Sequence, residues 1–280
     1  MRDQTFMTLM RLLPKSALSS AMGHASRLPL PAKVHQLAMR AFAQQYGVEL
    51  DEAEHALEGY PNFSQFFARK LKPGLRPVDL GGNVIVSPVD GAVSQAGYLE
   101  EGGLLQAKGV RYPVERLLGE VEAARPFQKG AFATLYLSPR DYHRIHAPLA
   151  GTIEGYAYIP GEFWPVNPSS VRSKEALFCV NERLVTYLAT AVGRCAVVKV
   201  GATCVSRIRA SYDELMTHQG ESGKTHRYPA PFAVEKGAEL GWFEMGSTVI
   251  LLFEEGRVRW DASLTPESKV RMGQRIGEAT

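Results

Sequence analysis

Short apolar runs, broken by glycine and other turn residues roughly every ten positions, dominate the sequence after residue 80. Many short strands at this spacing favour an antiparallel sandwich or barrel over a parallel α/β sheet. The sequence also has no dinucleotide-binding or P-loop glycine motif. We therefore expect an all-β body with strands in these runs: 84–86, 92–94, 104–106, 132–137, 152–153, 184–188, 196–200 and 248–253.

The N-terminal part has a helical pattern instead. Residues 1–48 carry six cations and one acid, a net charge of +5. Their apolar residues gather at 6–13 and recur at helical spacing over 34–46, and Leu28-Pro29-Leu30-Pro31 separates the two groups. The pattern predicts a hairpin of two amphipathic helices. Their apolar stripes can either lie in an anionic membrane interface or pack on the body of the protein.

The predicted fold class is therefore α+β. Residues 61–280 form a mainly β, sandwich- or barrel-like body, and residues 1–60 carry the N-terminal amphipathic helical hairpin. Asn62 is suited to the N-cap of one more short helix, which would contain Phe63, Phe66 and Phe67.

Composition excludes several classes of protein. The 280 residues are 45% hydrophobic and 22% charged, as in an ordinary globular protein, and a net charge of +3 without a basic–aromatic run does not favour nucleic-acid binding. Arg194 and Lys199 interrupt the longest apolar stretch, so we expect no membrane-spanning segment and a soluble or peripheral protein. Neither a disulfide framework nor a zinc knuckle is indicated by the three cysteines, Cys179, Cys195 and Cys204.

A possible reactive group precedes the last apolar run. Ser247 follows Gly246, whose carbonyl carbon is not shielded by a side chain. A serine hydroxyl deprotonated by a nearby base can attack that carbonyl and convert the peptide bond to an ester, which is how a chain can cut itself. The simpler interpretation is a Gly-Ser turn before a core strand. The polar stretch 211–231 just upstream is expected to be a loop.

Two histidines and an aspartate are candidate partners for this serine. Residues 138–146 follow a predicted strand and begin with Ser-Pro, which predicts a helical turn. Such a turn would place His143 and His146 on one face, where they could serve a metal or a proton transfer. A metal site would need a third ligand at a recognisable spacing, which the sequence does not offer. Two histidines on a surface turn are the simpler alternative. Asp90, before Gly91, is either part of a hairpin turn or a catalytic acid.

The acid, the histidine and the serine together form a possible relay. Asp90 would fix the imidazole tautomer of His146, and His146 would accept the proton of Ser247.

With these residues in place, the sequence resembles the phosphatidylserine decarboxylase family, in its short bacterial form, which is a family of pyruvoyl enzymes. Met245 stands where the family usually has leucine, an apolar change of similar volume. The resemblance covers most of residues 60–255 and rests on these blocks: 62–67, 76–79, 87–91, 105–109, 136–146, 200–203 and 239–253.

The resemblance implies a self-processing carboxy-lyase. Asp90, His146 and Ser247 would cut the chain between Gly246 and Ser247, giving fragments 1–246 and 247–280. Ser247 would become a covalent pyruvoyl group, so that no metal and no external cofactor is needed. That group would form a Schiff base with phosphatidylserine and yield phosphatidylethanolamine and carbon dioxide, and His143 would serve the decarboxylation step.

The resemblance also implies partners and a location. The enzyme would be a heterodimer of its own two fragments, with further homo-oligomerisation left open, and would not bind nucleic acid. A lipid substrate favours insertion of the N-terminal helices into an anionic membrane surface, as in a peripheral protein on the cytoplasmic face of the inner membrane. Because these helices contribute none of the relay residues, we expect self-cleavage to survive their deletion.

Two other classes of function remain as alternatives. A Ser-His-Asp hydrolase acting on an external ester or peptide would be expected to show a Gly-x-Ser-x-Gly elbow, and Val249 stands where the second glycine would be. A non-catalytic, β-rich membrane-binding module would not need the relay and would remain a single chain.

Overall fold

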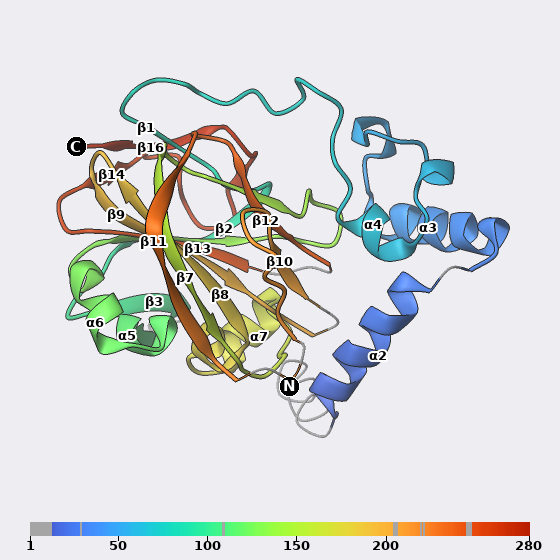
Figure 1. Cartoon of the computed structure of the whole chain (residues 1–280), viewed down its shortest axis with the longest axis horizontal. Coiled ribbons are helices and arrows are strands. Elements are labelled where there is room, and N and C mark those ends of the chain that lie inside the picture. Colours follow the sequence, from blue (N-terminus) through green and yellow to red (C-terminus); the bar gives the residue numbers. More distant parts are fainter. Residues whose placement is uncertain are drawn as a thin grey trace.

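The computed structural model describes residues 13–28, 30–107, 110–203, 207–218, 220, 222–244 and 248–280. Most of these residues form a β body, and helices from the N-terminal part lie along one side of it (Figure 1). The predicted fold class, mainly β with N-terminal helices, is confirmed. In chain order these elements are α2 (Lys15–Arg27), α3 (Ala32–Tyr46), the 3-10 turns η1 (Leu50–Glu52) and η2 (Leu57–Gly59), and α4 (Phe63–Phe67).

The largest sheet in the described part of the chain is antiparallel, and its spatial order differs strongly from the chain order. All but two of the runs expected from the sequence fall on it, and the other two fall on smaller sheets. Its strands lie in the order β11 (Lys224–Val234), β7 (Gly151–Ile159), β8 (Arg183–Thr190), β9 (Gly193–Val200), β13 (Thr248–Phe253), β5 (Ala131–Tyr136), β2 (Gly91–Tyr98) and β15 (Lys269–Val270).

Smaller sheets pack with this one around a continuous cluster of buried apolar side chains. One contains β10 (Ile208–Ala210), β12 (Glu239–Phe243) and β6 (Arg144–His146). Another contains β1 (Val84–Val86), β16 (Arg275–Ala279) and β14 (Val258–Trp260), and a third is the pair β3 (Gly103–Ala107) and β4 (Val110–Pro113). Short helical segments connect the strands: α5 (Val114–Leu118), α6 (Val121–Ala124), η3 (Arg125–Phe127), α7 (Pro168–Ser173) and α8 (Leu177–Val180).

Strand β13 lies near the middle of the large sheet. All six of its residues are buried, and it pairs along its whole length with β9 on one side and β5 on the other. A strand buried on both faces needs apolar residues at nearly every position, which explains why Thr-Val-Ile-Leu-Leu-Phe shows no alternation. Thr248 lies opposite Val200 and Tyr136, and these pairings fix the point at which the chain enters the sheet.

The apolar stripe of α3 predicted from the sequence is divided between the solvent and the interior of the protein. The buried residues of this helix are His35, Met39 and Ala43, spaced four positions apart. Val34 and Leu37 are 50% and 70% exposed. Phe42, in contrast, packs against Phe63 and lines a cavity between the helices and the β body. Val34 and Leu37 therefore remain available to a membrane, whereas Phe42 packs within the protein.

Three further expectations concern the helices. The side chain of Asn62 accepts a hydrogen bond from the backbone N–H of Gln65 at 2.9 Å, so the predicted N-cap of α4 is confirmed. The apolar group at 6–13 lies outside the described residues. Among the helices that the structure describes, none combines the length and the apolar character needed to cross a bilayer.

Two predictions about connecting segments are wrong. Part of the expected loop at 211–231 is strand β11, which pairs with β7 from Lys224 onward. Proline is tolerated there because β11 is an edge strand and its register shifts between Arg227 and Phe232. Asp90-Gly91 is not a hairpin turn either, because β1 pairs with β16 whereas β2 pairs with β5 and β15.

A lysine is fully buried within the large sheet. Lys199 on β9 has no exposed surface, and its Nζ donates a hydrogen bond to Oγ1 of Thr186. The same hydroxyl is 2.6 Å from the hydroxyl of Tyr212. Burial lowers the pKa of Lys199 to about 7, so this position carries an amine that is costly to charge.

We expect Lys199→Met to stabilise the fold at pH 7, by on the order of 1–3 kcal/mol, because it removes a buried cation and keeps an apolar side chain of similar length. The folded pKa near 7 lies below the unfolded value of about 10.4, so the unfolded chain binds more protons between these values and stability rises with pH across that window. Urea unfolding at pH 7, 8 and 9 tests this. A wild-type free energy of unfolding that does not rise with pH, or a variant with the same rise, would contradict it.

Candidate active site

The predicted cleavage point falls between two described strands. Gly246 and Ser247, together with Met245, lie outside the described residues; we call residues 245–247 the cleavage segment. Glu244 follows β12 directly before it, and Thr248 begins β13 directly after it. The structure thus shows the surroundings of both ends of the segment.

His146 lies on β6, which pairs with β12, the strand that leads to the cleavage segment. Its Nδ1 is 2.7 Å from the carbonyl oxygen of Gly237, and its Nε2 is 3.1 Å from the hydroxyl of Tyr142. A carbonyl can only accept, so Nδ1 carries the hydrogen and Nε2 accepts from the tyrosine. The imidazole therefore has the tautomer in which Nε2 can take a proton, as a general base requires.

The environment keeps this imidazole neutral. His146 is buried, and burial lowers its pKa, while the Gly237 carbonyl and the carboxylate of Glu239 act in the opposite direction. Gly237 has φ +79°, and a Cβ there would lie 2.6 Å from Cγ2 of Val78. The backbone carbonyl that holds the imidazole is thus placed by a position that requires glycine.

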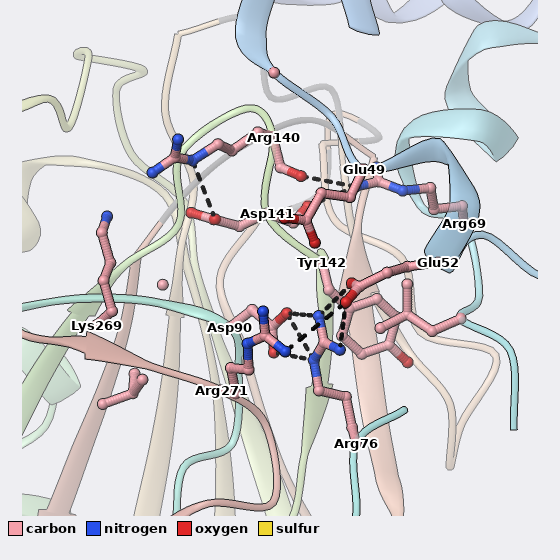
Figure 2. A pocket seen from close by; sticks show the side chains of 14 residues that line it. Glu49, Glu52, Arg69, Arg76, Asp90, Arg140, Asp141, Tyr142, Lys269 and Arg271 are labelled. Carbon is pink, nitrogen blue, oxygen red and sulfur yellow. Dashed lines mark hydrogen bonds and ion pairs between the residues drawn. The ribbon is translucent and has the colours of Figure 1, made fainter. Parts of the chain in front are cut away.

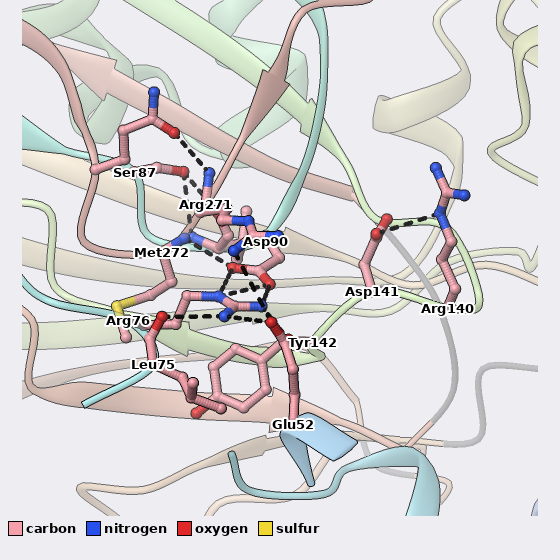
Figure 3. A network of polar contacts seen from close by, with 12 residues as sticks. Glu52, Leu75, Arg76, Ser87, Asp90, Arg140, Asp141, Tyr142, Arg271 and Met272 are labelled. Atoms are coloured by element: carbon pink, nitrogen blue, oxygen red, sulfur yellow. Dashed lines mark hydrogen bonds and ion pairs between the residues drawn. The ribbon is translucent and has the colours of Figure 1, made fainter. Parts of the chain in front are cut away.

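Asp90 does not contact the imidazole. Its carboxylate accepts hydrogen bonds from Nε of Arg76 at 2.9 and 3.0 Å and from Nη2 at 2.6 Å, and from the backbone N–H of Met272 at 2.8 Å. Figure 3 shows this network. The predicted contact in which Asp90 fixes the tautomer of His146 is therefore wrong in this structure, because the Gly237 carbonyl occupies that position.

Arg76 is shared between two carboxylates. Besides Asp90 it contacts Glu52, with Nη2–Oε2 at 2.6 Å and Nη1–Oε1 at 3.2 Å. The hydrogen bond from Arg76 lowers the pKa of Glu52 most strongly. Burial alone would lower the pKa of Arg76, but its hydrogen bonds to Asp90 and Glu52 outweigh that effect and raise it. The cluster joins the segment after α3 to the turn before β2 through buried, charge-assisted hydrogen bonds.

A polar cavity of about 270 Å³ adjoins this cluster (Figure 2). Asp90, Glu52 and Arg76 lie on its wall together with Asp141 and Tyr142. In Figure 2, further cations surround it: Arg140, Lys269 and Arg271. Since Tyr142 also contacts His146, the cavity wall connects the carboxylate cluster with the histidine.

The helical turn predicted at 138–146 is absent. Residues 138–141 form a turn, residues 142 and 143 have no regular structure, and residues 144–146 belong to β6. The carboxylate of Asp141 accepts hydrogen bonds from the backbone N–H and the hydroxyl of Ser138, at 2.7 and 2.8 Å. Asp141 N also donates to the Ser138 carbonyl at 2.9 Å. These bonds close the turn, and the chain then continues in an extended conformation.

The two histidines therefore do not share one helical face. His143 is fully buried with its ring 4.1 Å from that of Phe67, whereas the ring of His146 stacks on Tyr142. Nδ1 of His143 donates to the Asp141 carbonyl at 2.7 Å, and its Nε2 has no hydrogen-bond partner among the described residues. Burial, assisted by the charge of Arg69, lowers the pKa of His143 to about 3. Near neutral pH it therefore carries no charge, and its Nε2 can accept a hydrogen bond.

A large, mostly apolar cavity of about 580 Å³ separates the N-terminal helices from the β body. Tyr136 and Leu137, at the end of β5, form part of its wall on the body side, together with Ala202 after β9. Tyr136 pairs with Thr248, so the cavity adjoins the entry to β13. The helices contribute Met22, Ala25, His35, Ala38, Phe42, Tyr46, Phe63 and Phe67.

Sequence reasoning missed several residues of this site. Gly237 and Tyr142, the partners of His146, had no assigned role, and Arg76 appeared only within a block of the resemblance. The Gly237 carbonyl lies 91 residues after His146 in the chain, and a backbone carbonyl leaves no signal in a sequence. For Arg76 the sequence gives no separate signal, because Lys70, Lys72 and Asp79 nearby are charged as well.

The chain matches the phosphatidylserine decarboxylase family over residues 63–278. It is 69% identical to the phosphatidylserine decarboxylase proenzyme of Myxococcus xanthus (strain DK1622) and 53% identical to that of Anaeromyxobacter sp. (strain K). The proenzyme of Azotobacter vinelandii (strain DJ / ATCC BAA-1303) is 43% identical. Each of these matches covers 100% of both chains.

We expect His143 to make the fold sensitive to acid. Its folded pKa near 3 lies below the unfolded value of about 6.5, so the unfolded chain binds more protons between these values and stability is lost as the pH falls below the unfolded pKa. His143→Gln should show a shallower fall of the urea midpoint between pH 7 and pH 5. His55→Gln, at an exposed histidine, serves as the control, and equal slopes for wild type and His143→Gln would contradict the prediction.

Proposed function

The chain belongs to the phosphatidylserine decarboxylase family, and on that premise we propose that it is a carboxy-lyase that cuts itself between Gly246 and Ser247. It then converts phosphatidylserine to phosphatidylethanolamine and carbon dioxide. The observation that carries the proposal is His146, a neutral imidazole with an accepting Nε2, on a strand paired with the strand that leads to the cleavage segment.

Self-cleavage begins with a proton transfer. Nε2 of His146 takes the proton of the Ser247 hydroxyl, and the serine oxygen attacks the Gly246 carbonyl carbon, so that the peptide bond becomes an ester. The Gly237 carbonyl stabilises the imidazolium by accepting from Nδ1. Elimination of the ester frees the Gly246 carboxylate and leaves dehydroalanine at position 247, and water converts this to a pyruvoyl group with release of ammonia.

Asp90 acts in this scheme as a positioning residue. Its carboxylate holds Arg76 and the backbone of Met272, and it contributes a negative charge that favours protonation of His146 without a direct contact. Its loss would remove the hydrogen bonds that hold Arg76 from one side and would leave the buried backbone N–H of Met272 without its acceptor, which costs free energy of folding.

The pyruvoyl group formed from Ser247 supplies the carbonyl that takes the substrate amine and accepts the electrons released when carbon dioxide leaves. His143 is the residue proposed for this second reaction. Its Nε2 is buried and has no partner among the described residues, and its low pKa keeps it neutral. It therefore acts as an acceptor at the reacting centre and not as a cationic clamp for the substrate carboxylate.

The two fragments would remain together as a heterodimer. Fragment 247–280 contains β13, β14, β15 and β16. Of these, β13 pairs on both edges with strands of fragment 1–246, and β16 and β15 pair with β1 and β2. Cutting one peptide bond removes none of these pairings, and the buried apolar surface of β13 keeps the fragments associated.

A phospholipid substrate accounts for the N-terminal part. The apolar cavity beside the entry to β13 is suited to acyl chains, and Val34 and Leu37 present apolar surface to the solvent. Residues 1–48 carry a net charge of +5, which attracts anionic lipid. We therefore assign residues 1–60 to a peripheral contact with the cytoplasmic face of the inner membrane and residues 61–280 to catalysis.

We expect the purified protein to separate into fragments 1–246 and 247–280 on a denaturing gel. Ser247→Ala lacks the nucleophile and should remain uncut, and His146→Ala and Asp90→Ala should accumulate the precursor. Ser263→Ala, at an exposed serine of the same fragment, should cut like the wild type. An active protein that is a single uncut chain would contradict the proposal and favour a hydrolase, and an inactive uncut chain would favour a binding module.

The two histidines should divide the two reactions. His143→Ala should cut normally and release little carbon dioxide from phosphatidylserine, because its side chain serves turnover, whereas His146→Ala should fail to cut. A gel and a radiolabelled carbon dioxide assay on the same preparations distinguish these outcomes, and a thermal melt confirms that each variant is folded. If His143→Ala stays uncut while His146→Ala matures, the roles are reversed. If both mature and turn over normally, neither histidine is catalytic.

A further inference from the structure

The carboxylate closest in sequence to the cleavage segment is buried and held by two cations. The side chain of Glu244 is 5% exposed. Its Oε2 accepts from Nη1 of Arg27 at 2.8 Å, and its Oε1 accepts from Nε of Arg209 at 2.8 Å. Each carboxylate oxygen therefore has a cationic donor, and these two donors come from different parts of the chain.

One of these cations belongs to α2. Arg27 is in the last turn of that helix, whereas Arg209 lies on β10, which pairs directly with β12. Arg209 and Glu244 are thus attached to the same small sheet, and Arg27 reaches them from outside the β body. The ion pair between Arg27 and Glu244 spans 217 positions of the chain and ties the N-terminal helix to the entry of the cleavage segment.

Two more contacts fix α2 at this position. Oγ of Ser20 is 2.7 Å from Nε2 of His218, and Nζ of Lys15 lies 4.1 Å above the ring of Trp164. These contacts and the Arg27–Glu244 ion pair attach α2 to the body at three points along its length.

We infer that Arg27 is a positioning residue for self-cleavage: by holding the Glu244 carboxylate it fixes the chain immediately before Gly246 and Ser247, so that maturation requires α2 docked on the body. This inference rests on the proposed function. Self-cleavage depends on the placement of a serine oxygen against the carbonyl of its own preceding residue, and a displacement of about 1 Å can slow such a step roughly 100-fold. It also revises the expectation that deletion of the N-terminal helices leaves cleavage intact.

Loss of Arg27 has a defined physical consequence. Glu244 would lose the cation that contacts its Oε2, while its carboxylate remained buried and Arg209, whose own side chain is 36% exposed, still contacted its Oε1. A buried charge that loses one of its cationic donors tends to move toward water, and a movement of Glu244 displaces the chain directly before the cleavage segment. A neutral glutamine at position 244 has no such tendency, so Glu244→Gln should relieve the effect of losing Arg27.

The experiment follows the uncut 280-residue band over time after cell-free synthesis of the full chain. Arg27→Gln should cut about tenfold more slowly than the wild type, within the range expected for a misplaced reacting group, and Arg27→Lys should restore most of the rate because it keeps the cation. The double variant Arg27→Gln/Glu244→Gln should cut faster than Arg27→Gln alone, since Arg27 acts through Glu244. Arg125→Gln, which removes an exposed ion pair with Glu122, should cut at the wild-type rate.

Thermal melts of the same substitutions in the Ser247→Ala background separate positioning from stability. A slower cut with a melting temperature close to that of Ser247→Ala supports the inference. Wild-type cutting by Arg27→Gln, or a slower cut that follows a lowered melting temperature in every variant, overturns it. If the wild-type chain itself does not cut, the proposed function fails, and that result is distinct from a cutting wild type with an unaffected Arg27→Gln.

Discussion

The burial of β13 between β9 and β5 is the constraint on which the rest of the structure depends. A strand with all six residues buried and both edges paired cannot slide by one position without moving apolar side chains to the opposite face. Its register fixes Thr248, and therefore fixes where the preceding cleavage segment can lie. It also explains why cleavage next to the core would not release the C-terminal fragment, since the pairing and burial of β13 hold that fragment in place.

Around the entry to β13, neutral groups and charged groups have different roles. The groups proposed to move protons, His146 and His143, are buried and kept neutral, and each donates from Nδ1 to a backbone carbonyl, which leaves Nε2 as the acceptor. The charged groups are held in ion pairs around them: Arg76 lies between Asp90 and Glu52, and Glu244 lies between Arg27 and Arg209. Proton transfer is thus separated from the charge clusters that fix the backbone.

Most of the large sheet could be predicted from the sequence because its longer apolar strands leave a local signal. The strand at 248–253, which is apolar from Val249 onward, and the Asn62 cap are predicted from neighbouring residues alone, and both are confirmed. The prediction of a helical turn at 138–146 is wrong because a segment that begins with Ser-Pro can also form a non-helical turn, which the Asp141 carboxylate closes here. The prediction that Asp90 is the partner of His146 is wrong for a different reason. A carboxylate is visible in a sequence as a candidate, whereas the carbonyl of Gly237 becomes a partner only when β6 and β12 pair.

Intact mass spectrometry of the purified protein tests the central claim most directly, because it reads both the position of the cut and the chemistry at the new end. The account predicts two species, one of residues 1–246 with a free carboxylate and one of residues 247–280 lighter by one ammonia than a fragment that begins with serine. A small fragment with an intact N-terminal serine would show hydrolysis without formation of a pyruvoyl group. A single species with the mass of the whole chain in an active preparation would contradict the account.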